Sequence, residues 1–339
     1  MIKGPARFEY YLNKLQLLLE KASLQKNPAL WLYKNNARTA LFMLEGLAKM
    51  YSALHNKKKF TKLKIHFKLL EDTLGAIDYY DSIAKDLSLN KKINVEIINY
   101  LQAQSREKIQ SLNEILIENK WLSTTDNRIK KIHQKLQEAD WLKEEKEVKA
   151  INDFYGSAIY EITVFVQKKD FIFKNIEADV HELRRKLRWL SIYPQALRGC
   201  IQLRPGKDQH PELKKYLTKN IVNSAFNKMP ALGDASILLL LEQNYFYSLS
   251  WMINELGIIK DKGLHAVAVK EALEQTSELE EDAAFKKTYQ LLGNKQFMIP
   301  QLLEEAAAIC KIYFEEQNLE HLVLGVKTIE SDLTIFKSA

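Results

Sequence analysis

The sequence predicts an all-α protein in which two antiparallel helical bundles pack together and are related by a pseudo-repeat. Two observations lead to this fold class. The 339 residues include only 11 Gly and 7 Pro, too few for the many turns of an all-β protein. Leu, Lys, Glu, Ala and Ile instead fill long stretches in which apolar residues recur with the period of an α-helix.

Periodicity predicts five helices in the first half of the chain. Asn27-Pro28 separates the first from the second, because proline is favoured in the first turn of a helix. The N-cap residues Ser123, Thr124, Thr125 and Asp126 precede the fifth. The expected helices are residues 6–22, 30–55, 59–87, 91–120 and 127–150.

Six further helices are expected in the second half. Pro194, Arg204-Pro205-Gly206 and His210-Pro211 mark a loop region, and Ile299-Pro300 begins the last helix. The expected helices are residues 153–170, 174–193, 209–225, 231–258, 264–292 and 299–336. No low-complexity linker separates the halves, so we expect residues 1–150 and 151–339 to be two bundles of one continuous unit.

Charge and hydropathy restrict the class of protein. The formal net charge is +7, and residues 264–339 hold 7 Lys against 13 Asp and Glu, so the positive charge is concentrated in residues 1–263. A positive field attracts phosphate-rich polymers or acidic surfaces. The longest apolar run, residues 237–241, is too short to cross a bilayer, and charges interrupt the N-terminal segment. We therefore expect a cytoplasmic protein without a membrane partner.

The sequence lacks the usual patterns of catalytic and metal sites. Cys200 and Cys310 fit no metal-ligand spacing, the 7 His are scattered, and neither a Gly-rich phosphate loop nor a nucleophile elbow occurs. Glu145, Glu147 and Lys149 resemble the E-x-E-x-K pattern of triphosphate tunnel enzymes, which requires a β-strand. Their surroundings predict a helix, on which Glu145 and Lys149 form an i,i+4 ion pair. We expect no metal, no cofactor and no enzymatic activity.

The stretch VHELRRKLRWL, residues 180–190, predicts a functional surface. Wound as a helix, it places four cations on one side and its apolar residues in a neighbouring sector. Burial of the apolar sector would hold the cations on a rigid element, as an extended anion requires. The four cations are His181, Arg184, Arg185 and Arg188. A merely solvated helix face is the alternative interpretation.

A degenerate internal repeat is indicated by the order of features in the two halves. The first copy contains Arg38, a basic run at residues 58–62 and Leu74-Gly75. The second contains Arg184, a basic run at residues 214–219 and Leu232-Gly233. The extra length of the second copy falls mainly in the proline-rich loop, where insertions are tolerated.

These residues resemble the conserved histidine α-helical domain, known as CHAD. That family is described as two similar antiparallel four-helix bundles, each opening with a His that is followed by basic residues three, seven and ten positions later. His181, Arg184 and Arg188 match the first three positions, and Ser191 replaces the fourth. In the first half only Arg38 matches, because Asn35, Phe42 and Glu45 occupy the other positions.

The resemblance implies non-catalytic binding of inorganic polyphosphate or a similar polyanion through a basic surface. The residues expected to contribute are His181, Arg184, Arg185, Arg188, Arg38, Lys58, Lys62, His66, Lys214 and Lys215. Affinity for such a ligand comes mainly from counterion release and falls with salt.

Two alternatives remain open. Glu45 lies at the same helical azimuth as Arg38 and Lys49 and could pair with either, which would neutralise the first half of the surface. The chain would then be a structural or protein-interaction scaffold that has lost its anion site. A nucleic-acid ligand ranks below polyphosphate, because the basic helices lack the aromatic residues of a base-stacking surface.

Overall fold

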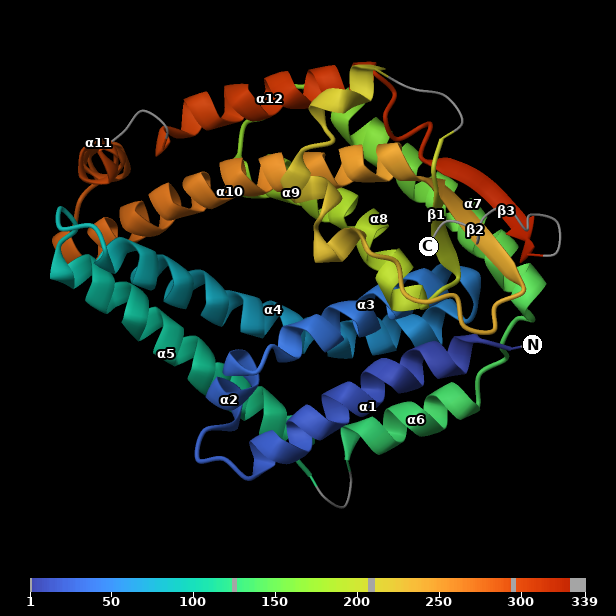
Figure 1. Cartoon of the computed structure of the whole chain (residues 1–339). Helices are drawn as coiled ribbons and strands as arrows, with labels where there is room; N and C mark the ends of the chain where they lie inside the picture. The colour runs from blue at the N-terminus through green and yellow to red at the C-terminus, as the bar shows by residue number, and fades with distance from the viewer. Residues whose placement is uncertain (1, 124–126, 207–210, 294–296, 330–339) are drawn as a thin grey trace.

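The computed structural model describes residues 2–123, 127–206, 211–293 and 297–329 and is mostly helical, which confirms the predicted all-α class. Figure 1 shows the N-terminal helices, in blue and cyan, on one side and the long C-terminal helices, in orange and red, on the other. None of the helices in the described residues combines the length and apolar character needed to cross a membrane.

The first half of the chain folds largely as predicted. It contains α1 (Gly4–Ser23), α2 (Pro28–Lys34), α3 (Ala37–Leu54), α4 (Lys57–Ser88), α5 (Val95–Glu118) and α6 (Arg128–Gln137). The helix expected at residues 30–55 is divided in two, because Asn36 has a left-handed φ of 54° that ends the helical path. Thr124, Thr125 and Asp126 of the expected N-cap cluster lie outside the described residues.

The helix α7 (Glu144–Gln167) joins two segments that were expected to be separate. The chain leaves α6 at Gln137, where the indole Nε1 of Trp141 donates to the carbonyl of Leu136 at 2.9 Å. It then begins α7, which continues through residue 150 without a break. The helix break predicted near residue 151 was therefore wrong, and the helix break near residue 140 was not predicted.

The second half departs more from the prediction. A π-helical segment (Ile176–His181) continues directly into α8 (Glu182–Leu197), and α10 (Gln243–Ser277) runs through the break expected at residues 258–264. The helix expected at residues 209–225 was wrong: the described part holds only the short α9 (Lys219–Val222) and two 3₁₀ turns. The remaining helices are α11 (Glu281–Leu292) and α12 (Ile299–Glu315).

A small sheet replaces parts of two expected helices. Its strands β1 (Ile201–Arg204), β2 (Ile237–Glu242) and β3 (Val323–Thr328) lie in the order β1-β2-β3. The β1–β2 pair is parallel with Ile201 opposite Leu239, and the β2–β3 pair is antiparallel. The helices expected at residues 231–258 and 299–336 were wrong at these strands, and residues 330–336 lie outside the described chain. The apolar run in β2 is short and buried on both faces, as in the central strand of a sheet.

Two clusters of buried side chains hold the helices together. The larger extends from Phe8 in α1 to Leu322 before β3, so both halves of the chain share one core. The smaller joins the ends of α4 and α5 to α10 and α11, and it includes Leu101 and Ala266. Because α10 contributes to both clusters, it links the two ends of the molecule.

Candidate anion-binding cavity

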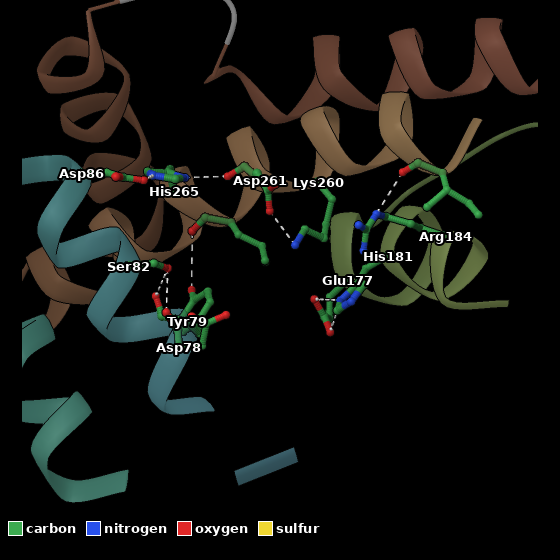
Figure 2. A network of polar contacts seen from close by, with 12 residues as sticks. Asp78, Tyr79, Ser82, Asp86, Glu177, His181, Arg184, Lys260, Asp261 and His265 are labelled. Atoms are coloured by element: carbon green, nitrogen blue, oxygen red, sulfur yellow. Dashed lines mark hydrogen bonds and ion pairs between the residues drawn. The ribbon is translucent and has the colours of Figure 1, made fainter. Parts of the chain in front are cut away.

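A cavity of about 1210 Å³ opens between the two halves of the chain. One wall is formed by α3 and α4, and the other by the π-helical segment, α8 and α10. Figure 2 shows polar side chains from α4 and α10 at one end of this region, with His181 and Arg184 at the other. The volume is sufficient for a small organic ligand or a segment of a polymer.

Five of the ten residues expected to bind an anion line this cavity. They are Arg38, His181, Arg184, Arg185 and Arg188. Arg38 comes from α3, whereas the others come from the π-helical segment and α8. Arg185 is exposed and lies 3.4 Å from Glu182 on its own helix. The cavity therefore brings together cations from distant parts of the sequence.

The other five expected residues do not line the cavity. They are Lys58, Lys62, His66, Lys214 and Lys215. Lys58, Lys62 and Lys214 are exposed, and Lys215 forms an ion pair with Glu316. His66 lies 3.4 Å from Arg128 of α6, and burial followed by the charge of Arg128 lowers its pKa. These residues do not extend the group of cations in the cavity.

Arg184 is held against the backbone of α10. Its Nε donates to the carbonyl of Ile253 at 3.1 Å. The next turn of α10 carries Gly257, where an added Cβ would lie only 3.0 Å from that Nε. The missing side chain thus permits the guanidinium to lie close to the helix backbone, as Figure 2 shows.

Arg188 and Arg38 share the ring of Phe42. The guanidinium carbons lie 4.4 Å and 5.1 Å from the ring centroid, respectively. Arg38 is also paired with two carboxylates of α4, at 2.7 Å to Glu71 and 3.3 Å to Asp78. The charge of Arg38 is thus largely compensated, and its contact with the ring helps to fix the aromatic surface on which Arg188 lies.

Arg184 and Arg188 form no ion pair with any carboxylate in the described part of the chain. Burial lowers the pKa of both groups, and for Arg188 the repulsion by Arg184 and Arg38 lowers it further, to about 10. Both side chains remain charged at neutral pH. An anion between them would relieve their mutual repulsion and replace the hydration lost on burial.

The π-helical segment positions His181 beside these arginines. Asn175 caps the segment, because its side-chain oxygen accepts from the backbone N–H groups of Glu177 and Ala178, each at 2.8 Å. One turn later, the Nδ1 of His181 lies 2.8 Å from the Glu177 carboxylate. The ion pair therefore competes with any anion for a protonated His181.

The charges lining the cavity balance in number: among the described residues there are seven Lys and Arg side chains and seven carboxylates. Six of the carboxylates have a basic partner. Glu71 and Asp78 pair with Arg38, Glu177 with His181, Asp72 with Lys68, Asp261 with Lys260, and Asp86 with His265. Figure 2 shows the last of these beside Asp261. The seventh is Glu45, which pairs with neither Arg38 nor Lys49.

The E-x-E-x-K pattern lies on α7, as predicted, and not on a strand. Glu145 forms the expected ion pair with Lys149 at 2.8 Å on the helix surface, whereas Glu147 is buried and binds Arg7 at 2.7 Å. The two carboxylates therefore point to different environments. Among the described residues, no group of His, Cys, Asp or Glu side chains is arranged to hold a metal ion.

The Leu-Gly pair predicted for the second half, Leu232-Gly233, does not line the cavity. Gly233 lies in a turn with a φ of 60°, and no other atom lies within 4 Å of the position of an added Cβ, whereas Leu256-Gly257 lies on α10 against Arg184. In the first half, an added Cβ on Gly75 would lie 2.7 Å from Arg38, which is a similar contact. In the sequence, the Leu-Gly dipeptide at 256–257, followed by Asp261, is the signal from which the contact between Gly257 and Arg184 could have been predicted.

Comparison of the chain with protein-family models, with curated proteins and with solved structures finds no match. The cavity, its side chains and their electrostatics therefore carry the evidence for function, together with the resemblance of residues 181–191 to CHAD.

Proposed function

We propose that this chain binds a phosphate-rich anion in the cavity, with inorganic polyphosphate as the first ligand to test, and that it does so without catalysis. The observation that carries the proposal is the pair of partly buried guanidiniums, Arg184 and Arg188, which have no carboxylate partner in the described residues. Arginine is suited to this ligand because its planar fork can engage two phosphate oxygens at once.

The surroundings prepare these two arginines for an anion. The α10 backbone fixes Arg184, and the ring of Phe42 supports Arg188, so little side-chain entropy is lost when a ligand binds. Partial burial strengthens the attraction, since the effective dielectric constant is lower than in water. The resemblance of the 181–191 segment to CHAD supports the same ligand class.

The proposed site is shorter than the basic surface expected from the sequence. Lys58, Lys62, Lys214 and Lys215 do not line the cavity, so a polyphosphate chain would contact it through a few consecutive phosphates. Of the seven Lys and Arg side chains that line the cavity, only Arg184, Arg188 and the exposed Lys174 form no ion pair within the described residues, so the attraction is confined to these cations.

Replacing Arg188 tests the proposal directly. Removal of one charge-assisted contact typically costs about 1.5–3 kcal/mol, so Arg188→Gln should weaken polyphosphate binding by about tenfold or more. The measurement is isothermal titration with polyphosphate of defined chain length. Thermal unfolding of the same samples would establish that the variant is folded.

Lys62→Gln is the matched control, because it also removes one positive charge but lies at an exposed position outside the cavity. It should change the affinity less than about twofold, since exposed charges are screened by salt. Equal losses in both variants would show that binding depends on overall charge and not on this site. An unaltered affinity in Arg188→Gln, or no binding to the wild-type chain, would favour the scaffold alternative.

A further inference from the structure

Glu45 faces the cavity without a partner. Only 4% of its surface is exposed, yet it is one of the residues that line the cavity. No hydrogen bond or ion pair to its carboxyl group is present in the described part of the chain. The carboxyl oxygens are not among the side-chain atoms of the described residues that are shut off from solvent without a partner, so they open into the cavity, where a ligand oxygen can reach them.

The charged neighbours of Glu45 are engaged elsewhere. On α4, Lys68 pairs with Asp72 at 2.5 Å and Glu71 pairs with Arg38 at 2.7 Å. On α8, Arg185 lies 3.4 Å from Glu182, and the buried Tyr193 is neutral because burial raises its pKa. On its own helix, Lys49 lies over the ring of Trp189 at 5.0 Å. None of these groups is bonded to the Glu45 carboxylate.

Burial therefore dominates the titration of Glu45. It raises the pKa of the carboxyl group to about 7, with Glu71 and Asp72 adding to the effect and Lys68 and Arg185 opposing it. At neutral pH the charged and uncharged forms are both populated. The charged form repels an anion in the cavity, whereas the neutral form offers an O–H donor.

We infer that Glu45 is a further ligand-binding residue, which is protonated when the anion is bound, taking the proton from solvent where it was charged before, and which donates a hydrogen bond to an anion oxygen. This inference rests on the proposed function, because it assumes that an anion enters the cavity. Protonation of Glu45 would make the affinity for the anion depend on pH near neutrality. The two arginines alone would not, because both remain charged there.

The pH dependence of binding follows from this coupling. Since only protonated Glu45 accommodates the anion, affinity should be highest below about pH 7 and should fall by up to about tenfold for each pH unit above it. His181 and His265 also line the cavity, and Lys49, whose pKa is lowered to about 8 mainly by burial, lies nearby. Their contributions must be separated from that of Glu45.

Glu45→Gln provides this separation. The amide has the shape of the protonated acid and carries no charge at any pH, so the variant should bind polyphosphate at about pH 8.5 roughly tenfold or more tightly than the wild type. At about pH 6 the two proteins should bind alike. Any titration of the ligand or the histidines is common to both proteins and cancels in the comparison. Lys49 differs, because the charge of Glu45 raises its pKa; its loss in the variant leaves Lys49 less positive and works against the expected gain in affinity.

Proton uptake supplies a second readout. Titrations of long-chain polyphosphate near pH 7, in two buffers of different ionisation enthalpy, should show uptake of about half a proton per bound anion in the wild type in excess of that in Glu45→Gln. His181→Gln is the control and should retain this excess. Identical pH profiles and proton uptake in the wild type and Glu45→Gln, with polyphosphate bound by both, would overturn the inference and leave the proposed function intact. Failure of both proteins to bind at any pH would overturn both.

Discussion

Two glycines determine where the arginines of the cavity lie. Gly75 on α4 leaves room for the guanidinium of Arg38, and Gly257 on α10 leaves room for that of Arg184. Neither glycine has the positive φ that would explain its presence by backbone conformation. Each instead permits a close approach between a side chain and a helix backbone, since an added Cβ would lie 2.7 Å from Arg38 or 3.0 Å from Arg184 and the guanidinium would have to shift.

Gly257→Ala should therefore separate stability from binding. An alanine in a helix interior typically stabilises the fold by about 0.5–1 kcal/mol relative to glycine, but here its methyl group would lie 3.0 Å from the Arg184 Nε and would push the guanidinium out of its present position beside the Ile253 carbonyl by a few tenths of an ångström. We expect unfolding temperature to stay the same or rise while polyphosphate affinity falls several-fold. Calorimetry and titration on the same preparation would measure both.

Gly156→Ala in α7 is the control for this substitution. Gly156 is an exposed helical glycine with no atom near the position of the new methyl group. It should gain stability without any change in affinity. A loss of affinity in both variants, or in neither, would contradict the role assigned to Gly257.

The sequence predicts the arginines better than it predicts their surroundings. Arg184 and Arg188 could be identified because their placement depends on local helical periodicity, which residues close to them in the sequence determine. Gly257 was missed because its importance arises only from the packing of α8 on α10. Glu45 was identified as a departure from the CHAD pattern. Its lack of a partner could not be predicted, because it depends on the ion pairs that Arg38 forms with Glu71 and Asp78 of α4.

At the level of elements, a buried polar network joins α1, α3 and α7. Arg7 of α1 donates to Glu147 of α7 at 2.7 Å, and the hydroxyl of Tyr51 of α3 donates to the same carboxylate at 2.6 Å. Glu147 is fully buried and Arg7 nearly so. The network fixes the relative positions of these three helices, and the rings of Phe8 and Trp141 pack against that of Tyr51.

Glu147→Gln should destabilise the fold strongly. The substitution leaves the guanidinium of Arg7 buried without a negative partner. Such a change typically lowers the free energy of unfolding by about 3–5 kcal/mol. Urea denaturation followed by circular dichroism would measure the loss. Glu145→Gln, two residues away at an exposed ion pair, should leave the midpoint nearly unchanged. Similar midpoints for the two variants would contradict this account of the network.

Elements were predictable where local periodicity decided them. The first-half helices α1, α4 and α5 lie close to their expected bounds because each has an apolar stripe and clear ends. The strand β2 was missed because a short apolar run is compatible with either a buried helix or a buried strand. Only its pairing with β1 and β3 decides between them, and that pairing joins residues far apart in the chain.

At the scale of the whole molecule, the cations divide into a few in the cavity and many on the outer surface. Only the former should set the salt dependence of binding. We expect the logarithm of the polyphosphate association constant to fall with the logarithm of salt concentration with a slope of about −2 to −3, as for three or four contacts. A surface using all ten expected residues would give a slope of about −7.

Chain length provides the companion measurement. Tripolyphosphate should show nearly the same slope as a long polyphosphate, because a few phosphates fill the contacts that the cavity offers. A slope that steepens markedly with chain length would show that exposed lysines such as Lys58 and Lys62 also take part, and would contradict a site confined to the cavity.

The packing of the helices around the cavity was the feature least predictable from the sequence. Composition and periodicity give the all-α class, since both are properties of the chain itself. The cavity requires α3 and α4 to lie opposite α8 and α10, and this arrangement is fixed by the shared core of both halves. The convergence of Arg38 with Arg184 and Arg188 is a product of that long-range packing.

The unbroken course of α10 has a mechanical consequence. A continuous rod anchored in separate cores at both ends resists bending between them, so the span it forms over the binding space should keep a constant width. The ligand would then bind to a preformed cavity without a closing motion, which favours fast association and fast dissociation.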